Sequence, residues 1–249
     1  MAEHAVSAAI LVIGDEILSG RTKDKNIGYI AEYLTAIGID VREVRVVPDE
    51  ADEIVAALNA LRERYTYVFT TGGIGPTHDD ITADAVARAF GVGIDIDPRA
   101  VALMRERYAE GELNEARLRM ARIPFGADLI ENPISKAPGF RIGNVITMAG
   151  VPSIMQAMLD AVAPTLQGGK RMLAESIDAD GLAEGNYAAG LGQIAAGHSG
   201  VSIGSYPSFT GTGFRNQIVV RGKDEADVAA AVAAVRDLLA SLAGDRKPL

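Results

Sequence analysis

The sequence contains no cysteine and no tryptophan, and aromatic residues make up only 5% of its 249 residues. The absence of cysteine excludes disulfide bonds, thiol nucleophiles and thiolate metal sites. No apolar run approaches the roughly 20 residues that a transmembrane helix needs, and the first residues lack the basic region of a signal peptide. We therefore expect a cytoplasmic protein with no membrane partner.

Positive charge is also scarce, because 33 acidic residues outnumber 24 lysines and arginines and give a net charge of −9. This balance argues against nucleic acid as a partner, since nucleic-acid phosphates attract basic surfaces. Hydrophobic residues make up 48% of the chain, which is ample for a core. The length allows one large domain or two modest ones.

Apolar runs of strand length alternate with amphipathic helical patterns in the first part of the chain. Strands are predicted at residues 6–13, 39–47 and 67–71, and helices at residues 26–37, 51–64 and 82–90. This β-α-β-α-β-α order is typical of a three-layer, doubly wound α/β fold with a mostly parallel sheet. Residues 140–148 predict a later strand, interrupted at Gly143-Asn144 by a hairpin turn or bulge, and residues 153–166 predict a helix.

Between these parts, residues 91–97 predict a turn. Two helices are then predicted, over residues 98–108 and 112–122, as an insertion without strand signals. Its charges are most simply a solvated helix face, although Arg117, Arg119 or Arg122 could reach a second phosphate or a neighbouring subunit.

The pattern changes at Gln167-Gly168-Gly169-Lys170, which predicts a domain boundary. We expect one domain over residues 1–168 and a small α+β module over residues 169–249. The module has the order β-α-β-β-α. Its elements are predicted at residues 171–177, 187–196, 200–206, 214–221 and 225–242.

A glycine-rich segment follows the third predicted strand. Gly72, Gly73 and Gly75 allow close approach of a ligand, and their amides can form an anion-binding concavity beside a helix N-terminus. Asp79 and Asp80 follow, and carboxylates are the oxygen ligands that Mg²⁺ takes beside phosphates. The segment therefore predicts a nucleotide phosphate site. A structural interpretation, with Asp80 as the N-cap of the next helix, is compatible with that function.

Polar or glycine-rich segments follow the other predicted strands as well. Asp15 and Glu16 follow the first strand, Asp49 the second, and Gly150-Val151-Pro152-Ser153 a later one. Because the carboxyl ends of parallel strands face one crevice, we expect these segments to converge with the glycine loop. Crowded carboxylates repel one another unless a cation binds. We therefore expect a divalent metal ion, Mg²⁺, Mn²⁺ or Co²⁺, with Asp15, Glu16, Asp49 and Asp80 as candidate ligands.

Several spaced motifs resemble the MoaB/Mog family of molybdenum cofactor biosynthesis domains. They are Thr71-Gly72-Gly73-Ile74-Gly75 with Asp80-Ile81-Thr82, Gly14-Asp15-Glu16-Ile17-Leu18-Ser19-Gly20, Val47-Pro48-Asp49-Glu50, Asn132-Pro133 and Ala137-Pro138-Gly139. The resemblance spans about residues 6–168. Within the family, the chain looks most like the N-terminal domain of CinA, a competence/damage-inducible protein, and the molybdopterin-binding-like domain of FAD synthase.

The resemblance implies roles for individual residues. Asp49 and Asp80 match the two carboxylates linked to metal-nucleotide chemistry, with Asp80 on the metal or its water and Asp49 as metal ligand or general base. The residues implied to bind the phosphate or the rest of the ligand are Thr71, Gly72, Gly73, Gly75, Thr82, Ser19, Gly20, Asn26, Gly150, Pro152 and Ser153. Ser135 and Lys136 depart from the family, because they replace the small residues expected there.

The resemblance also implies the function. The first hypothesis is a metal-dependent hydrolase of a nucleotide pyrophosphate of the ADP-ribose or FAD type. The alternative is a molybdopterin-binding protein or molybdopterin adenylyltransferase, and the second alternative is a module that binds a pterin or nucleotide without turnover. Because relatives in the family are oligomeric, we expect a homo-oligomer, either a dimer or a trimer.

Overall fold

Four parallel strands form the centre of the sheet in the N-terminal part of the chain. They are β1 (Ser7–Ile13), β2 (Asp40–Val47), β3 (Tyr67–Thr71) and β8 (Val145–Met148), in the order β2-β1-β3-β8. Two antiparallel strands, β7 (Gly139–Ile142) and β6 (Asp128–Ile130), extend this sheet beyond β8. The predicted mostly parallel α/β sheet is confirmed.

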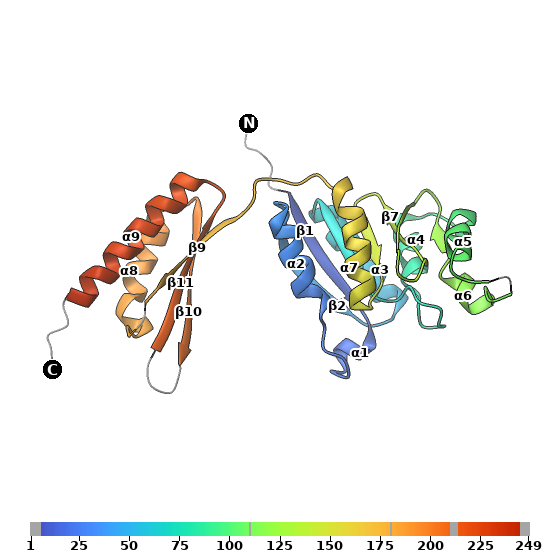
Figure 1. Ribbon diagram of the computed structural model, residues 1–249, viewed down its shortest axis with the longest axis horizontal. Helices are drawn as coiled ribbons and strands as arrows, with labels where there is room; N and C mark the ends of the chain where they lie inside the picture. The colour runs from blue at the N-terminus through green and yellow to red at the C-terminus, as the bar shows by residue number, and fades with distance from the viewer. Residues whose placement is uncertain (1–5, 110, 180, 210–213, 245–249) are drawn as a thin grey trace. The chain divides into compact units, whose positions relative to one another are not determined.

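Helices cover both faces of this sheet, which explains why β1 is almost continuously apolar and why every residue of β3 is buried. On one face, α2 (Asn26–Ala36) and α7 (Pro152–Val162) lie side by side and bury Leu34 and Met158 against the strands (Figure 1). On the other face, α3 (Ala51–Arg64) and α4 (Thr82–Phe90) bury Leu58 and Val86. The bounds predicted for α3, β3 and α4 coincide with those observed.

The insertion differs from the prediction, because it contains strands. β4 (Ile94–Ile96), inside the predicted turn, pairs with β5 (Arg122–Pro124), where a helix was predicted to end. The helices α5 (Pro98–Arg105) and α6 (Glu115–Arg119) are shorter than predicted. Asp97 and Asn114 cap their N-termini, accepting from the amides of Arg99 and Arg117. Strands of three residues are too short to show a period of two in the sequence, so they were missed.

Three further short elements were not predicted as such, and the first of them is β6. The residues after β1 form α1 (Asp15–Leu18), and α7 ends in a 3₁₀ turn, η1 (Ala163–Thr165), where the prediction continues the helix. The predicted hairpin is confirmed, since β7 and β8 are joined at residues 143–144. The Asn144 side-chain amide donates to the carbonyls of Arg62 and Tyr65, which ties this hairpin to the end of α3.

The structure describes residues 6–109, 111–179, 181–209 and 214–244, and the chain divides into two units between Gly169 and Lys170. The C-terminal unit consists of β9 (Leu173–Asp178), α8 (Glu184–Gly197), β10 (Val201–Phe209), β11 (Phe214–Gly222) and α9 (Glu225–Gly244). Its antiparallel sheet has the order β10-β11-β9, and both helices contribute to one core around Tyr187 and Ile218.

Within the described residues, every helix is too short or too polar to cross a membrane.

Phe140 of β7 tests how much the N-terminal sheet depends on its own buried core. Its side chain is 1% exposed, whereas Phe125, in the loop after β5, is 60% exposed. Truncation of a buried phenylalanine leaves a cavity, so we expect Phe140→Ala to lower the free energy of unfolding by about 3–5 kcal/mol. Phe125→Ala should change it by about 0.5 kcal/mol or less. Urea denaturation followed by circular dichroism would check both values, and equal losses would contradict the assignment of the core.

Candidate functional site

The glycine loop after β3 folds tightly against neighbouring strand ends. Gly72 has φ 101°, and a Cβ there would lie 2.1 Å from the Ile13 carbonyl oxygen, so only glycine fits. Its amide donates to the Met148 carbonyl (3.2 Å). The Thr82 hydroxyl donates to the Gly72 carbonyl (3.0 Å), and the Thr82 amide donates to the Gly73 carbonyl (2.9 Å). The loop is therefore held by β1, β8 and the start of α4.

Asp80 is part of this loop and does not cap α4, so the structural interpretation of Asp80 is wrong. Ile81 occupies the N-cap position of α4. The Asp80 carboxylate instead accepts from the amide of Thr77 (2.8 Å) and from its hydroxyl (2.5 Å). A Cβ on Gly75 would lie 2.6 Å from Asp80 Oδ2, so the carboxylate rests directly against the glycine backbone.

A second acidic group lies at the ends of β1 and β2. The Asp15 amide donates to Asp49 Oδ2 (3.0 Å). Burial raises the pKa of the Asp49 carboxyl, and the negative charges of Asp15, Glu16 and Asp79 raise it further against the opposing effect of the Asp15 amide. Acidic side chains from the ends of three strands therefore act on one another.

A cavity of about 530 Å³ opens at this end of the sheet, within the size range of small-molecule sites. Its polar lining includes Glu16, Thr22, Asp80 and the glycine loop. Its apolar lining includes Tyr108, Met120, Ala137, Val151, Ile154 and Met158. Such a cavity can hold a ligand that has both charged and apolar parts.

The predicted site residues fall into three groups. Those that line the cavity are Glu16, Gly72, Gly73, Gly75, Asp80, Gly150 and Pro152. Those that are exposed and lie outside its lining are Asp15, Ser19, Gly20 and Ser153. Asp49 is half-buried next to Asp15, and Asn26, Thr71 and Thr82 are buried beneath the lining.

The buried members support the cavity from below. Asn26 Nδ2 donates to the Gly150 carbonyl (2.8 Å), which fixes the loop after β8. Asn26 Oδ1 and Thr71 Oγ1 are buried and have no hydrogen-bond partner among the described residues. Thr82 holds the glycine loop, as described above.

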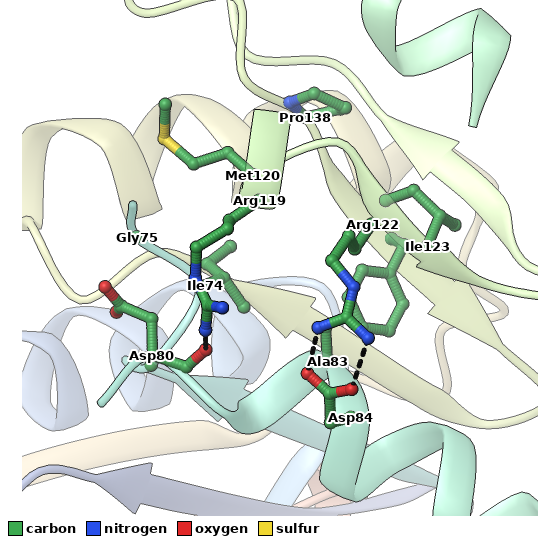
Figure 2. A pocket seen from close by; sticks show the side chains of 12 residues that line it. Ile74, Gly75, Asp80, Ala83, Asp84, Arg119, Met120, Arg122, Ile123 and Pro138 are labelled. Atoms are coloured by element: carbon green, nitrogen blue, oxygen red, sulfur yellow. Dashed lines mark hydrogen bonds and ion pairs between the residues drawn. The ribbon is translucent and has the colours of Figure 1, made fainter. Parts of the chain in front are cut away.

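The site also contains residues that sequence reasoning missed or left open. Arg119 donates to the carbonyls of Thr77 (3.2 Å) and Asp80 (3.4 Å), and Arg122 forms two bonds with the Asp84 carboxylate (2.7 and 2.6 Å; Figure 2). Both arginines thus tie the insertion to the start of α4. The helical pattern of the insertion contains no signal that distinguishes these arginines from a solvated face.

The carboxylates near the cavity can be compared with the ligands that the expected metal ion requires. Within the described part of the chain, no three histidine, aspartate or glutamate side chains gather closely enough to hold a metal by themselves. Mg²⁺, however, usually keeps several waters and takes one or two carboxylates together with substrate phosphates. Glu16 and Asp80 line one cavity and supply such oxygens. The residues therefore fit a metal that is held jointly with a phosphate, and they do not form a complete protein cage.

This α/β fold, with a glycine loop and a cavity at the carboxyl ends of parallel strands, is the arrangement typical of domains that bind small molecules. Residues 9–168 match the family described as probable molybdopterin binding domain, and residues 171–244 match the middle domain of FAD synthase. The chain belongs to the molybdopterin-binding domain family. The resemblance inferred from the motifs is confirmed.

Individual relatives agree with this assignment. A protein from Caldivirga maquilingensis is 36% identical over 208 residues, covering 80% of this chain and 81% of that protein. A CinA-like protein from Citrifermentans bemidjiense is 44% identical over 168 residues, covering 64% of this chain but only 40% of that protein. The crystal structure of CinA from Thermoplasma acidophilum, described as having unknown function, matches 66% of this chain and 99% of its own with a TM-score of 0.62 and 38% identity.

Gly72→Ala tests the close approach of the glycine loop to β1. Because the added Cβ meets a backbone carbonyl at a positive φ, we expect a loss of about 1–3 kcal/mol in the free energy of unfolding. Gly28→Ala is the matched control, since Gly28 lies in α2 and its added Cβ meets nothing within 4 Å. It should raise stability by roughly 0.5–1 kcal/mol. Thermal denaturation of both variants checks this, and a stable Gly72→Ala protein would show that the approach is looser than described.

Proposed function

We propose that the cavity binds a nucleotide of the ADP-ribose or FAD type and that the protein hydrolyses its pyrophosphate with the help of a divalent metal ion. The observation that carries this proposal is the joint presence, in one cavity, of a glycine loop, two carboxylates and an apolar wall. A dinucleotide has matching parts, namely a pyrophosphate and aromatic rings. The family assignment supports a pterin or nucleotide as the ligand class.

The glycine loop would bind the pyrophosphate. The loop immediately precedes α4, whose N-terminus carries the positive end of the helix dipole. Thr82 and Arg119 occupy the carbonyls of the loop, which leaves the loop in a fixed position before the ligand arrives. Binding to a preformed loop loses less conformational entropy than binding that must order it.

The carboxylates would supply the remaining chemistry. Glu16 and Asp80 would hold the metal ion, which neutralises phosphate charge and lowers the pKa of a water when bound. Asp80 is held in place by both hydrogen bonds from Thr77. The raised pKa of Asp49 makes that carboxylate a better proton acceptor, since a base works best when its pKa is near the working pH. The resemblance assigns Asp49 to metal or general-base duty, and as a base it would take the proton of the attacking water, although its carboxylate lies beside Asp15 and not in the cavity lining.

A second candidate function is binding without turnover, with a pterin nucleotide as ligand. The incomplete carboxylate set favours it, because no cluster of three ligands exists among the described residues. The description of the matching family favours the pterin. Adenylylation of molybdopterin differs from both candidates, since it consumes ATP. For any of these functions we expect a cytoplasmic dimer or trimer.

Asp80→Asn separates these functions. We expect the wild-type protein to hydrolyse ADP-ribose to AMP and a sugar phosphate, or FAD to AMP and a flavin phosphate. This reaction should occur only with Mg²⁺, Mn²⁺ or Co²⁺, as measured by chromatography. Asp80→Asn should lower this rate by about 10²–10⁴-fold, because it removes a metal ligand and a bound metal ion contributes several kcal/mol of transition-state stabilisation. Asp128→Asn, an exposed carboxylate on β6, is the control and should leave the rate unchanged. Intact nucleotides with every metal would rule out hydrolysis and favour the binding role.

Asp49→Asn should make the protein more stable in metal-free buffer at neutral pH. The folded-state pKa of Asp49 lies above its ordinary value of 3.8. The folded state therefore holds the proton more tightly than the unfolded state, and stability falls as the pH rises from 3.8 through the folded-state pKa. Asparagine carries no charge, and its amide oxygen can still accept from the Asp15 amide. Melting temperatures from pH 3 to pH 8 should show the variant above the wild type at pH 7, with the difference vanishing at the acid end. A gap that stays constant across this pH range would contradict the raised pKa.

A further inference from the structure

A rigid turn, residues 132–137, forms part of the cavity wall. Asn132 Oδ1 accepts from the amides of Ile134 (3.1 Å) and Ser135 (3.2 Å), and Asn132 Nδ2 donates to the Ala137 carbonyl (2.9 Å) and to Ser135 Oγ (2.5 Å). The Lys136 amide donates to the Asn132 carbonyl (2.9 Å). Lys136 has φ 63°, an uncommon conformation for a residue other than glycine. Residues held in this way cluster at ligand sites.

This turn leaves one hydrogen-bond donor unused. Two backbone amides donate to Asn132 Oδ1, so the side-chain amide group must be the donor toward Ser135 Oγ. Ser135 Oγ thus accepts a hydrogen bond, and its own proton has no partner among the described residues. Ser135 lines the cavity and is half-buried. The hydroxyl can therefore donate to a ligand, and its position is set before the ligand binds.

An aromatic side chain lines the same cavity. Tyr108 is half-buried, and the Arg117 guanidinium lies 4.5 Å from its ring centroid. Arg117 Nη1 also donates to the Glu112 carbonyl (2.6 Å), which holds the cation over the ring. Met120 lies in the same wall, and methionine adapts well to aromatic surfaces.

We propose that Ser135 and Tyr108 recognise the planar heterocycle of the ligand, the Tyr108 ring by contact through the face opposite Arg117 and the Ser135 hydroxyl by donating to a ring nitrogen or carbonyl. This inference deepens the proposed function, on which it rests, and it concerns binding rather than hydrolysis. It assigns a role to the position at which Ser135 replaces the small residue expected from the family. A flavin, pterin or purine has both the π-face and the acceptor atom that these two groups need.

Isothermal titration of the full chain with ADP-ribose, FAD and inorganic pyrophosphate tests the proposal. Ser135→Ala should weaken ADP-ribose or FAD binding by about 3- to 10-fold, as expected for one neutral hydrogen bond. Tyr108→Leu should weaken it by about 10-fold or more, whereas Tyr108→Phe should keep it, because the π-face remains. Pyrophosphate affinity should stay at the wild-type value in all three variants.

Two control substitutions in the C-terminal unit remove the same chemical groups as Ser135→Ala and Tyr108→Leu. Ser199→Ala removes an exposed hydroxyl, and Tyr206→Leu removes a tyrosine whose ring lies 5.8 Å from the Arg221 guanidinium carbon. Neither should change the affinity for any ligand. Circular dichroism would confirm that each variant is folded.

The outcomes distinguish this inference from the proposed function. If the wild type binds none of the ligands, both are wrong. If it binds ADP-ribose or FAD, and Ser135→Ala and Tyr108→Leu bind them equally well, only the ring recognition is wrong. If either variant loses pyrophosphate affinity to the same extent, that residue acts at the phosphate end, and the inference is also wrong.

Discussion

The close approach of Gly72 to the end of β1 is the constraint on which the site depends. With no Cβ, this residue lets the loop after β3 cross next to the Ile13 carbonyl, and a Cβ on Gly150 would lie 3.2 Å from the Gly72 Cα. Two loops from adjacent parallel strands therefore meet with almost no side-chain volume between them. Both glycines line the cavity at the carboxyl edge of the sheet.

The insertion supplies a part of the cavity wall that the sheet does not. Arg119 and the ion pair of Arg122 with Asp84 connect it to the start of α4, and the Asn144 contacts hold the β7–β8 hairpin against α3. Tyr108 and Met120 can form a wall of the cavity because these contacts hold the segment that carries them. The cavity is thus built by packing between segments that lie far apart in the chain.

Electrostatics oppose stability at this site. Burial and neighbouring carboxylates raise the pKa of Asp49, so its ionisation destabilises the folded protein. Crowded negative charge of this kind is relieved by a cation or by a proton. A site that holds such groups close together is less stable than the same fold with neutral side chains, and this cost is typical of positions used for chemistry.

The sequence by itself determined the sheet and the loop, because both depend on local patterns. A long apolar run predicted β1, strand-forming residues predicted β3, the helical period predicted α3 and α4, and the closely spaced glycines predicted a loop after β3. The tertiary structure decided what local patterns do not encode. The pairing of β4 with β5 joins strands too short to show a period, and the hydrogen bonds of Asp80 go to Thr77 rather than to α4. The places of Tyr108 and Ser135 in the cavity wall depend on contacts between residues far apart in the chain, which no sequence period can specify.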